Sequence, residues 1–208
     1  MSTILAERTA GLAVRRSDYR GLVALAASAG GLLALGCVLA GLPGQFPLPV
    51  VIVQHLNPDY ASHMAQILSR RTPLRVRDAQ EGEAVEPGTA YLARPGRHLP
   101  VTDDGRLHLS DAERVHYVRP AADLLCQSVA RVYGAGAIGV VLTGTGVDGS
   151  AGVCEIRRRG GIVLALDPAG AEFPRMPESA AATDGVDLVL PLRDIAGALV
   201  ALAGRGAR

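Results

Sequence analysis

The chain has 208 residues, of which 49% are hydrophobic and 20% charged, with a formal net charge of +1 at pH 7. This size and composition predict one globular domain with a substantial core. The near-neutral charge gives no reason to expect electrostatic binding to nucleic acid or to an anionic membrane surface. The chain contains no lysine, which excludes a Schiff base or a serine–lysine dyad.

The N-terminal segment and the cysteines bear on domain limits and location. Charged residues interrupt residues 1–19, so they do not read as a secretory signal, and no apolar run reaches the length of a membrane span. We expect a flexible leader over 1–19 and one folded domain over 20–208. Cys37, Cys126 and Cys154 fit neither a disulfide framework nor a zinc pattern, which favours a reducing, cytoplasmic compartment. We expect Cys37 and Cys154 to be small core residues.

Apolar strands alternate with helical patterns along the chain. Short apolar runs predict strands buried on both faces, and stretches of helical length predict the helices between them. The predicted strands are 22–27, 49–55, 74–79, 89–94, 137–144, 161–166 and 186–191. The predicted helices are 31–42, 59–71, 120–133, 149–159 and 192–203. This order predicts an α/β fold, a three-layer, doubly wound and mostly parallel sheet.

The segment 97–110 interrupts this alternation. Two alternating arms flank Asp104 and Gly105, a dipeptide typical of tight hairpin turns. We therefore expect an inserted antiparallel hairpin. His98 and His108 lie within it and are expected at the surface.

Polar side chains follow three of the predicted strands. Ser28 comes directly after the first strand, His55 closes the second, and Asp148 lies in the turn after the strand 137–144. Ligands of open parallel sheets bind at the carboxyl ends of the strands. These three residues supply a nucleophile, a general base and a carboxylate that could orient the base. A serine hydroxyl needs such a base, and a histidine can take its proton near neutral pH.

Backbone amides around these residues are candidates for stabilising an oxyanion. Ala29, Gly30 and Gly31 precede or open the helix 31–42, where amides and the helix dipole favour negative charge. The turn "TGTG", which includes Thr145 and Gly146, could supply a second donor because glycine permits close backbone approach.

Each candidate also has a purely structural interpretation. Ser28 could cap the helix that follows it, and Asp148 could cap the helix 149–159. His55 could be an ordinary residue at the end of a strand. Their joint placement at strand ends is what favours a catalytic site.

Other functional motifs are incomplete. "GTGVDGSAG" lacks the G-K-[ST] ending of a phosphate-binding loop, and "AASAGG" does not provide G-x-G-x-x-G. Ala26 occupies the first glycine position of a G-x-S-x-G elbow. His63, His98, His108 and His116 show no metal-ligand spacing. We expect neither a metal nor a cofactor.

Six ordered blocks carry a resemblance to a known family. They are "LAASAGGLLAL", "VVIVQHLNP", "EPGTAYLARPGRHL", "YVRPAADLLCQSVA", "VVLTGTGVDGSAGV" and "FPRMPESA". From about residue 20 to about 203, the chain resembles the CheB-type protein-glutamate methylesterase domain. The resemblance implies a doubly wound fold with a hairpin and a catalytic triad of Ser28, His55 and Asp148. It also implies hydrolysis of γ-glutamyl methyl esters on chemoreceptors, with deamidation of receptor glutamines as a further activity, and it adds Met176 to the oxyanion and substrate-binding residues.

The chain departs from the family pattern at several points. Ala29 replaces the usual threonine, Thr145 stands where methionine is common, and Arg175 stands where glycine is usual. Typical members also carry an N-terminal receiver domain, for which this chain has no room. We therefore expect a stand-alone catalytic domain that is constitutively open or controlled by another protein.

The resemblance also implies partners. These are the methylated cytoplasmic helices of chemoreceptors, with a methyltransferase or a separate response regulator as further candidates, and no nucleic acid or membrane insertion. Two other hypotheses remain. The chain could be a catalytically weak regulatory module that binds a receptor or methyltransferase, or an esterase that acts on a different ester.

Overall fold

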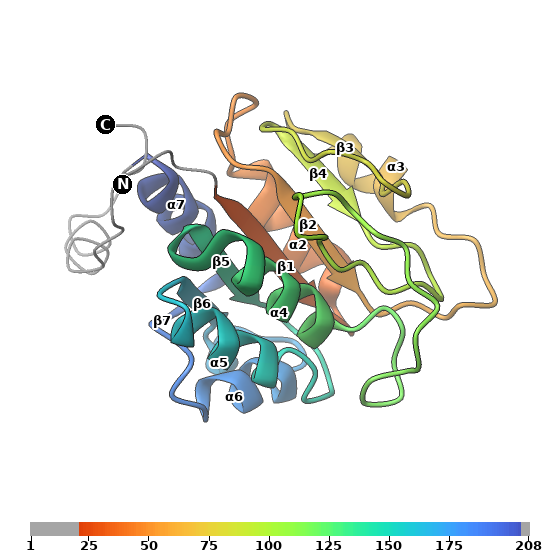
Figure 1. Cartoon of the computed structure of the whole chain (residues 1–208). Helices are drawn as coiled ribbons and strands as arrows, with labels where there is room; N and C mark the ends of the chain where they lie inside the picture. Colours follow the sequence, from red (N-terminus) through yellow and green to blue (C-terminus); the bar gives the residue numbers. More distant parts are fainter. Residues whose placement is uncertain (1–20, 205–208) are drawn as a thin grey trace.

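The computed structural model of the chain describes residues 21–204. Seven strands form one sheet in the order β3-β4-β2-β1-β5-β6-β7, and every neighbouring pair is parallel. Helices cover both faces of this sheet (Figure 1). The α/β, three-layer, doubly wound architecture predicted from the sequence is confirmed. The leader predicted for residues 1–19 lies outside the described residues.

The elements follow the predicted alternation closely. The strands are β1 (Leu22–Ala27), β2 (Val50–Gln54), β3 (Arg75–Asp78), β4 (Thr89–Leu92), β5 (Ala137–Val141), β6 (Ile162–Leu166) and β7 (Leu188–Leu190). The α-helices are α2 (Gly31–Ala40), α3 (Met64–Ser69), α4 (Ala122–Tyr133), α5 (Ser150–Arg158), α6 (Arg175–Ala181) and α7 (Leu192–Ala203). Two 3-10 turns, η1 (Gly134–Gly136) and η2 (Pro168–Gly170), complete the described elements.

Two hydrophobic cores lie on opposite faces of the sheet. All six residues of β1 are buried, and alternate side chains enter different cores because successive residues of a strand point to opposite faces. Val23 and Leu25 pack in the core that holds α2, α3 and α7. Leu22 and Ala24 pack in the core that holds α4, α5 and α6. This double burial explains why the strand reads as an uninterrupted apolar run.

The chain reverses its direction across the sheet at β1. From β1 it proceeds through β2 toward β3 and β4, and then returns to place β5 on the other side of β1. The crevice between the carboxyl ends of β1 and β5 is therefore the topological switch point, where doubly wound proteins bind their ligands.

The predicted hairpin is present but does not join the main sheet. Val101 pairs antiparallel with Leu107, and His98 pairs with Ser110. The Gly105 amide donates to Thr102 O at 2.8 Å and closes the turn. Apolar side chains of the two arms, including Val101 and Leu107, pack in the same core as α4, so the hairpin covers that face of the sheet.

Two helix predictions need correction. The predicted helix 59–71 begins only at Met64. Asn57 Oδ1 accepts from the Asp59 amide at 3.0 Å and Ser62 Oγ accepts from the Met64 amide at 3.2 Å, so side chains hold this stretch in turns before the helix begins. The short helix α6 was not predicted, because Pro174 and Pro177 obscure its pattern. Pro177 lies in its first turn, where proline is tolerated.

Several burial predictions were wrong. Cys37 and Cys154 are exposed, whereas Cys126 is buried. His98 is fully buried: its Nδ1 accepts from the Ala121 amide at 3.1 Å and its Nε2 donates to Glu113 O at 3.0 Å. Two backbone partners allow a histidine to be buried without a penalty for unpaired polar atoms.

Within 21–204, no helix is long and apolar enough to cross a membrane.

Candidate active site

Ser28 lies at the switch point, on the turn between β1 and α2. Its amide donates to Thr143 O at 2.9 Å, which ties the turn to the segment after β5. The N-cap of α2 is Gly30, and no side chain makes a capping hydrogen bond there. The alternative interpretation, in which Ser28 caps this helix, is therefore excluded. Its side chain remains available on a partly exposed turn.

Gly30 allows this turn to form. Its φ is +74°, a left-handed conformation that glycine adopts without steric cost. A Cβ at this position would also lie 3.0 Å from Glu172 Oε2 and 3.2 Å from Thr143 Cγ2. The backbone thus bends sharply where the segments after β5 and before α6 approach it.

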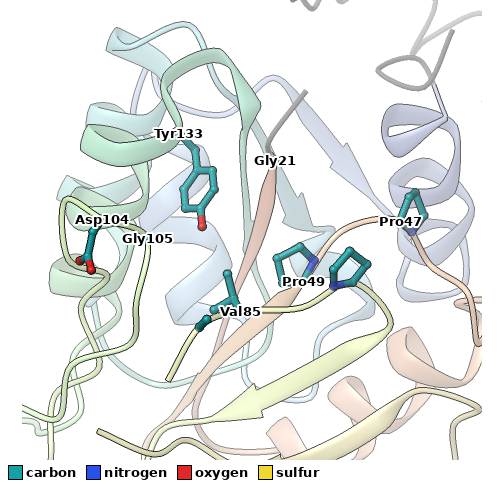
Figure 2. A pocket seen from close by; sticks show the side chains of 9 residues that line it. Gly21, Pro47, Pro49, Val85, Asp104, Gly105 and Tyr133 are labelled. Carbon is teal, nitrogen blue, oxygen red and sulfur yellow. The ribbon is translucent and has the colours of Figure 1, made fainter. Parts of the chain in front are cut away.

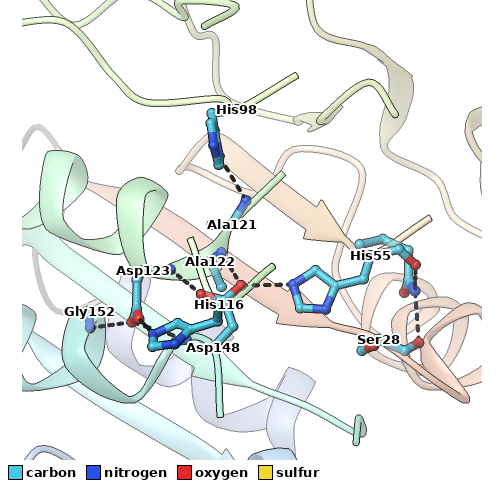
Figure 3. A network of polar contacts seen from close by, with 11 residues as sticks. Ser28, His55, His98, His116, Ala121, Ala122, Asp123, Asp148 and Gly152 are labelled. Carbon is cyan, nitrogen blue, oxygen red and sulfur yellow. Dashed lines mark hydrogen bonds and ion pairs between the residues drawn. The ribbon is translucent and has the colours of Figure 1, made fainter. Parts of the chain in front are cut away.

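His55 and Asp148 form a direct pair next to Ser28. The His55 Nε2 and Asp148 Oδ2 atoms are 2.7 Å apart, and Asp148 is only 2% exposed. Figure 3 shows the His55 ring between Asp148 and Ser28. The His55 amide donates to Ala27 O at 3.1 Å, so backbone pairing between β1 and β2 continues up to the residue before Ser28.

The Asp148 carboxylate is held in its ionised form. Burial acts to raise its pKa, but hydrogen bonds from His55 and from the amides of Asp123 and Ala122 outweigh burial and lower the pKa. Those amides donate at 3.0 and 2.6 Å and belong to the first turn of α4. An ionised carboxylate only accepts hydrogen bonds. A neutral His55 therefore donates from Nε2 and keeps its lone pair on Nδ1.

Asp148 is a helix cap as well as the partner of His55. It caps α4, whereas the sequence suggested that Asp148 could cap the helix 149–159. The first turn of that helix, α5, is instead served by Asp123, whose Oδ1 accepts from the amides of Gly149 at 3.0 Å and Gly152 at 2.7 Å. Asp148 therefore stabilises the N-terminus of α4, the helix that contains Asp123, and Asp123 stabilises the N-terminus of α5, the helix that follows Asp148.

Asp123 is a buried residue that sequence reasoning missed. Burial, together with the nearby Asp148 carboxylate, raises its pKa despite hydrogen bonds from the Gly152 amide and from His116. His116 Nε2 lies 3.0 Å from Asp123 Oδ2. The sequence feature that could have pointed to Asp123 is an aspartate among apolar residues at the start of α4. Acidic side chains are almost never fully buried unless they are paired.

The predicted oxyanion residues occupy different positions. Ala29 and Gly30 are partly exposed at the N-terminus of α2, and Thr145 is exposed on the loop after β5, next to the half-buried Gly146. The Gly31 amide is already used, because it donates to Ser28 O at 2.9 Å. Gly31 is therefore not a free donor for a substrate.

Met176 lies behind the site instead of on its open side. It is fully buried, and its amide donates to Gly144 O at 2.9 Å. A Cβ on Gly144 would be 2.6 Å from Met176 Sδ and 2.8 Å from Ser28 Cβ. The predicted contact of Met176 with substrate is therefore corrected to packing against the Ser28 turn. Arg175, the neighbouring departure from the family pattern, is exposed.

Gln54 connects the backbones of the two candidate residues. Its Nε2 donates to Ser28 O at 2.7 Å and to His55 O at 3.0 Å, and the residue is 5% exposed. A Cβ on Gly31 would lie 1.8 Å from Gln54 Oε1, so glycine makes room for this side chain. A polar residue at the end of the apolar run "VVIVQ" was the sequence signal for this role.

Cavities lie at both ends of the sheet. One of about 310 Å³ is lined by Gly21, Pro49 and Tyr133 (Figure 2), and Gly21 and Pro49 precede β1 and β2. It therefore lies at the amino ends of the strands, opposite Ser28. A smaller cavity of about 90 Å³ adjoins His55.

Among residues 21–204, no group of three or more histidine, cysteine or acidic side chains could hold a metal ion.

The fold and this arrangement define a doubly wound α/β protein with a serine, a histidine and an aspartate at its switch point. A profile of the CheB methylesterase family matches residues 23–199. The chain therefore belongs to the CheB methylesterase family.

Individual relatives agree with this assignment. The chain is 42% identical, over 88% of its length, to a protein-glutamate methylesterase/protein-glutamine glutaminase of Pseudomonas putida, of which it spans 54%. It is 37% identical, over 86% of its length, to a putative enzyme of the same name from Leptospira interrogans, of which it spans 92%. The CheB methylesterase catalytic domain of Thermotoga maritima superposes with a TM-score of 0.84 at 34% identity, covering 88% of this chain and 98% of that one.

Proposed function

We propose that the chain is a cytoplasmic protein-glutamate methylesterase that hydrolyses γ-glutamyl methyl esters on chemoreceptors. The observation that carries the proposal is the 2.7 Å pair of His55 and the buried Asp148 beside Ser28. The names of its relatives support the substrate class. The same site would deamidate glutamine by releasing ammonia in place of methanol, as the glutaminase part of those names suggests.

The mechanism follows from the three side chains. Ser28 Oγ attacks the ester carbonyl carbon while His55 Nδ1 takes the hydroxyl proton. Asp148 stabilises the resulting imidazolium and holds its orientation. The oxyanion is stabilised by amides at the N-terminus of α2 and on the Thr145–Gly146 loop. His55 then protonates the departing methoxide to give methanol, and water attacks the acyl-enzyme to release glutamate and free Ser28.

The nucleophile is tested with Ser28→Ala. Methanol release from a methylated chemoreceptor is expected to fall by a factor of roughly 10³ or more, and a serine-directed phosphonate should no longer form a covalent adduct. Ser69→Ala is the matched control, since Ser69 is an exposed serine on α3 and should keep wild-type turnover. Methanol release by Ser28→Ala at the wild-type rate would show that another residue is the nucleophile.

Two other functions are separated by the same assays. A regulatory module without turnover would bind a methylated receptor, a methyltransferase or a response regulator but form no phosphonate adduct. An esterase for a different substrate would form the adduct but release no methanol from methylated receptor.

Gln54→Met tests whether the link between Ser28 and His55 matters for catalysis. Methionine keeps the length of the side chain but removes both hydrogen bonds. Because small misplacements of reacting groups are costly, we expect kcat to fall roughly 10- to 100-fold with little change in KM. Gln66→Met, on the exposed side of α3, is the control. If both variants remained folded and matched the wild-type kcat, the link would have no catalytic role.

A further inference from the structure

A strained tight turn lies next to the candidate active site. Val115 and Val118 exchange backbone hydrogen bonds of 3.2 and 3.0 Å, which leaves His116 and Tyr117 as the two central residues. Both have positive φ values, 50° and 65°. Two-residue turns of this kind normally use Asn-Gly or Asp-Gly, and positive φ is costly for larger side chains. Such strain persists where the surrounding structure enforces it, and it concentrates at functional sites.

The surrounding structure holds this turn from two sides. His116 Nε2 lies 3.0 Å from the buried Asp123 carboxylate, which is itself tied to α5. On the C-terminal side, Arg119 NH1 donates to Asp111 O at 2.8 Å and Ala112 O at 3.0 Å. The turn is thus anchored to the same aspartate pair that positions His55.

The turn presents an aromatic ring and a cation beside His55. Tyr117 is 93% exposed and lines the cavity of about 90 Å³ together with His55, Arg114 and Arg119. No acidic residue lines that cavity. Arg114 makes no hydrogen bond or ion pair with any residue in 21–204, and Arg119 Nε is buried without a partner among them. The cavity therefore offers unused donors and a positive charge.

We infer that residues 114–119 form a recognition loop that binds an acidic side chain of the substrate protein, next to the ester held at Ser28. A guanidinium is the side chain best suited to a carboxylate, and the cavity has room for one small side chain. The Tyr117 ring covers the apolar part of the bound segment. Because the turn that carries Tyr117 is already held in place, less conformational entropy is lost on binding. The inference rests on the proposed function and adds a preference for acidic sequence around the ester.

Two synthetic peptides test this preference. Both contain one γ-methyl glutamate; in one the flanking polar residues are glutamates, and in the other they are glutamines. The wild-type protein is expected to show a KM about fivefold lower for the glutamate-flanked peptide, with the same kcat, and high salt should reduce the difference. Arg114→Gln should remove the preference. Tyr117→Asn, which tolerates the positive φ, should raise KM for both peptides.

Arg193→Gln is the control, because Arg193 is exposed on α7 and should leave the preference intact. Equal KM values for the two peptides in the wild type would overturn the recognition loop, as would an unchanged preference in Arg114→Gln. A wild-type protein that hydrolyses neither peptide and forms no phosphonate adduct would overturn the proposed function itself.

Discussion

Asp148→Asn is expected to lower kcat for ester hydrolysis by roughly 10⁴-fold. The carboxylate forces a neutral His55 to donate from Nε2, at 2.7 Å. An asparagine can present its amide group to His55 instead, so that Nε2 accepts, the proton moves to Nδ1, and Ser28 loses its base. The variant also loses an anion at the N-terminus of α4, which should cost about 1–2 kcal/mol of unfolding free energy. Steady-state kinetics and urea unfolding measure the two effects.

The pH dependence of stability gives an independent readout of the same carboxylate. The pKa of Asp148 is lowered in the folded protein, so the unfolded chain binds the proton first as the pH falls. The stability that Asp148 contributes is therefore present above the ordinary aspartate pKa and is lost as the pH falls toward the lowered value. In Asp148→Asn, unfolding free energy should fall less steeply over that acidic range than in the wild type.

Asp123→Asn is the matched control, because Asp123 faces Asp148 across the same two helix ends. Asparagine keeps an oxygen that can accept from the Gly149 and Gly152 amides. The pKa of Asp123 is raised in the folded protein, so its ionisation lowers the unfolding free energy as the pH rises through this raised pKa. The neutral asparagine removes this cost. We expect kcat to remain close to wild type. Equal losses of kcat in the two variants would contradict a specific role for Asp148.

The sequence predicted the fold and the strand-end residues because both depend on local patterns. Continuous apolar runs such as 22–27 mark strands buried on both faces, and the alternation of strands with helices determines which ends of the strands meet. Ser28, His55 and Asp148 could therefore be placed at one edge of the sheet. The helix that Asp148 caps could not be identified from the sequence, because a cap depends on which helix N-terminus lies nearby in space.

The residues that sequence reasoning missed act through contacts distant in the chain. Gln54 bonds to Ser28 O across 26 positions, and Asp123 bonds to the Gly149 amide across 26 positions. His98 was expected at the surface because it lies in the predicted hairpin, and its burial depends on partners supplied by Glu113 and Ala121. Local composition does not encode such partners, so only the unusual placement of a polar residue in an apolar pattern could point to them.

Gly144→Ala should impair both stability and turnover. The new Cβ would lie 2.6 Å from Met176 Sδ and 2.8 Å from Ser28 Cβ, closer than carbon and sulfur atoms approach in proteins. Met176 is fully buried, so relieving this clash disturbs the packing of Met176 against the Ser28 turn. We expect a loss of about 1–3 kcal/mol in unfolding free energy and a fall in kcat of roughly 100-fold. Chemical denaturation and methanol release provide the two measurements.

Gly146→Ala separates this steric effect from a general sensitivity of the loop. It lies two residues further along, and a Cβ there would meet only the Asp148 amide nitrogen, at 3.9 Å, which is ordinary van der Waals contact. The Gly146→Ala variant should keep the unfolding free energy of the wild type. The sequence predicted close backbone approach for the whole "TGTG" turn, but the structure confines it to Gly144, because only that glycine lies between Ser28 and Met176. Equal destabilisation by the two substitutions would show that loop flexibility, and not the packing of Met176 behind Ser28, sets the position of the serine.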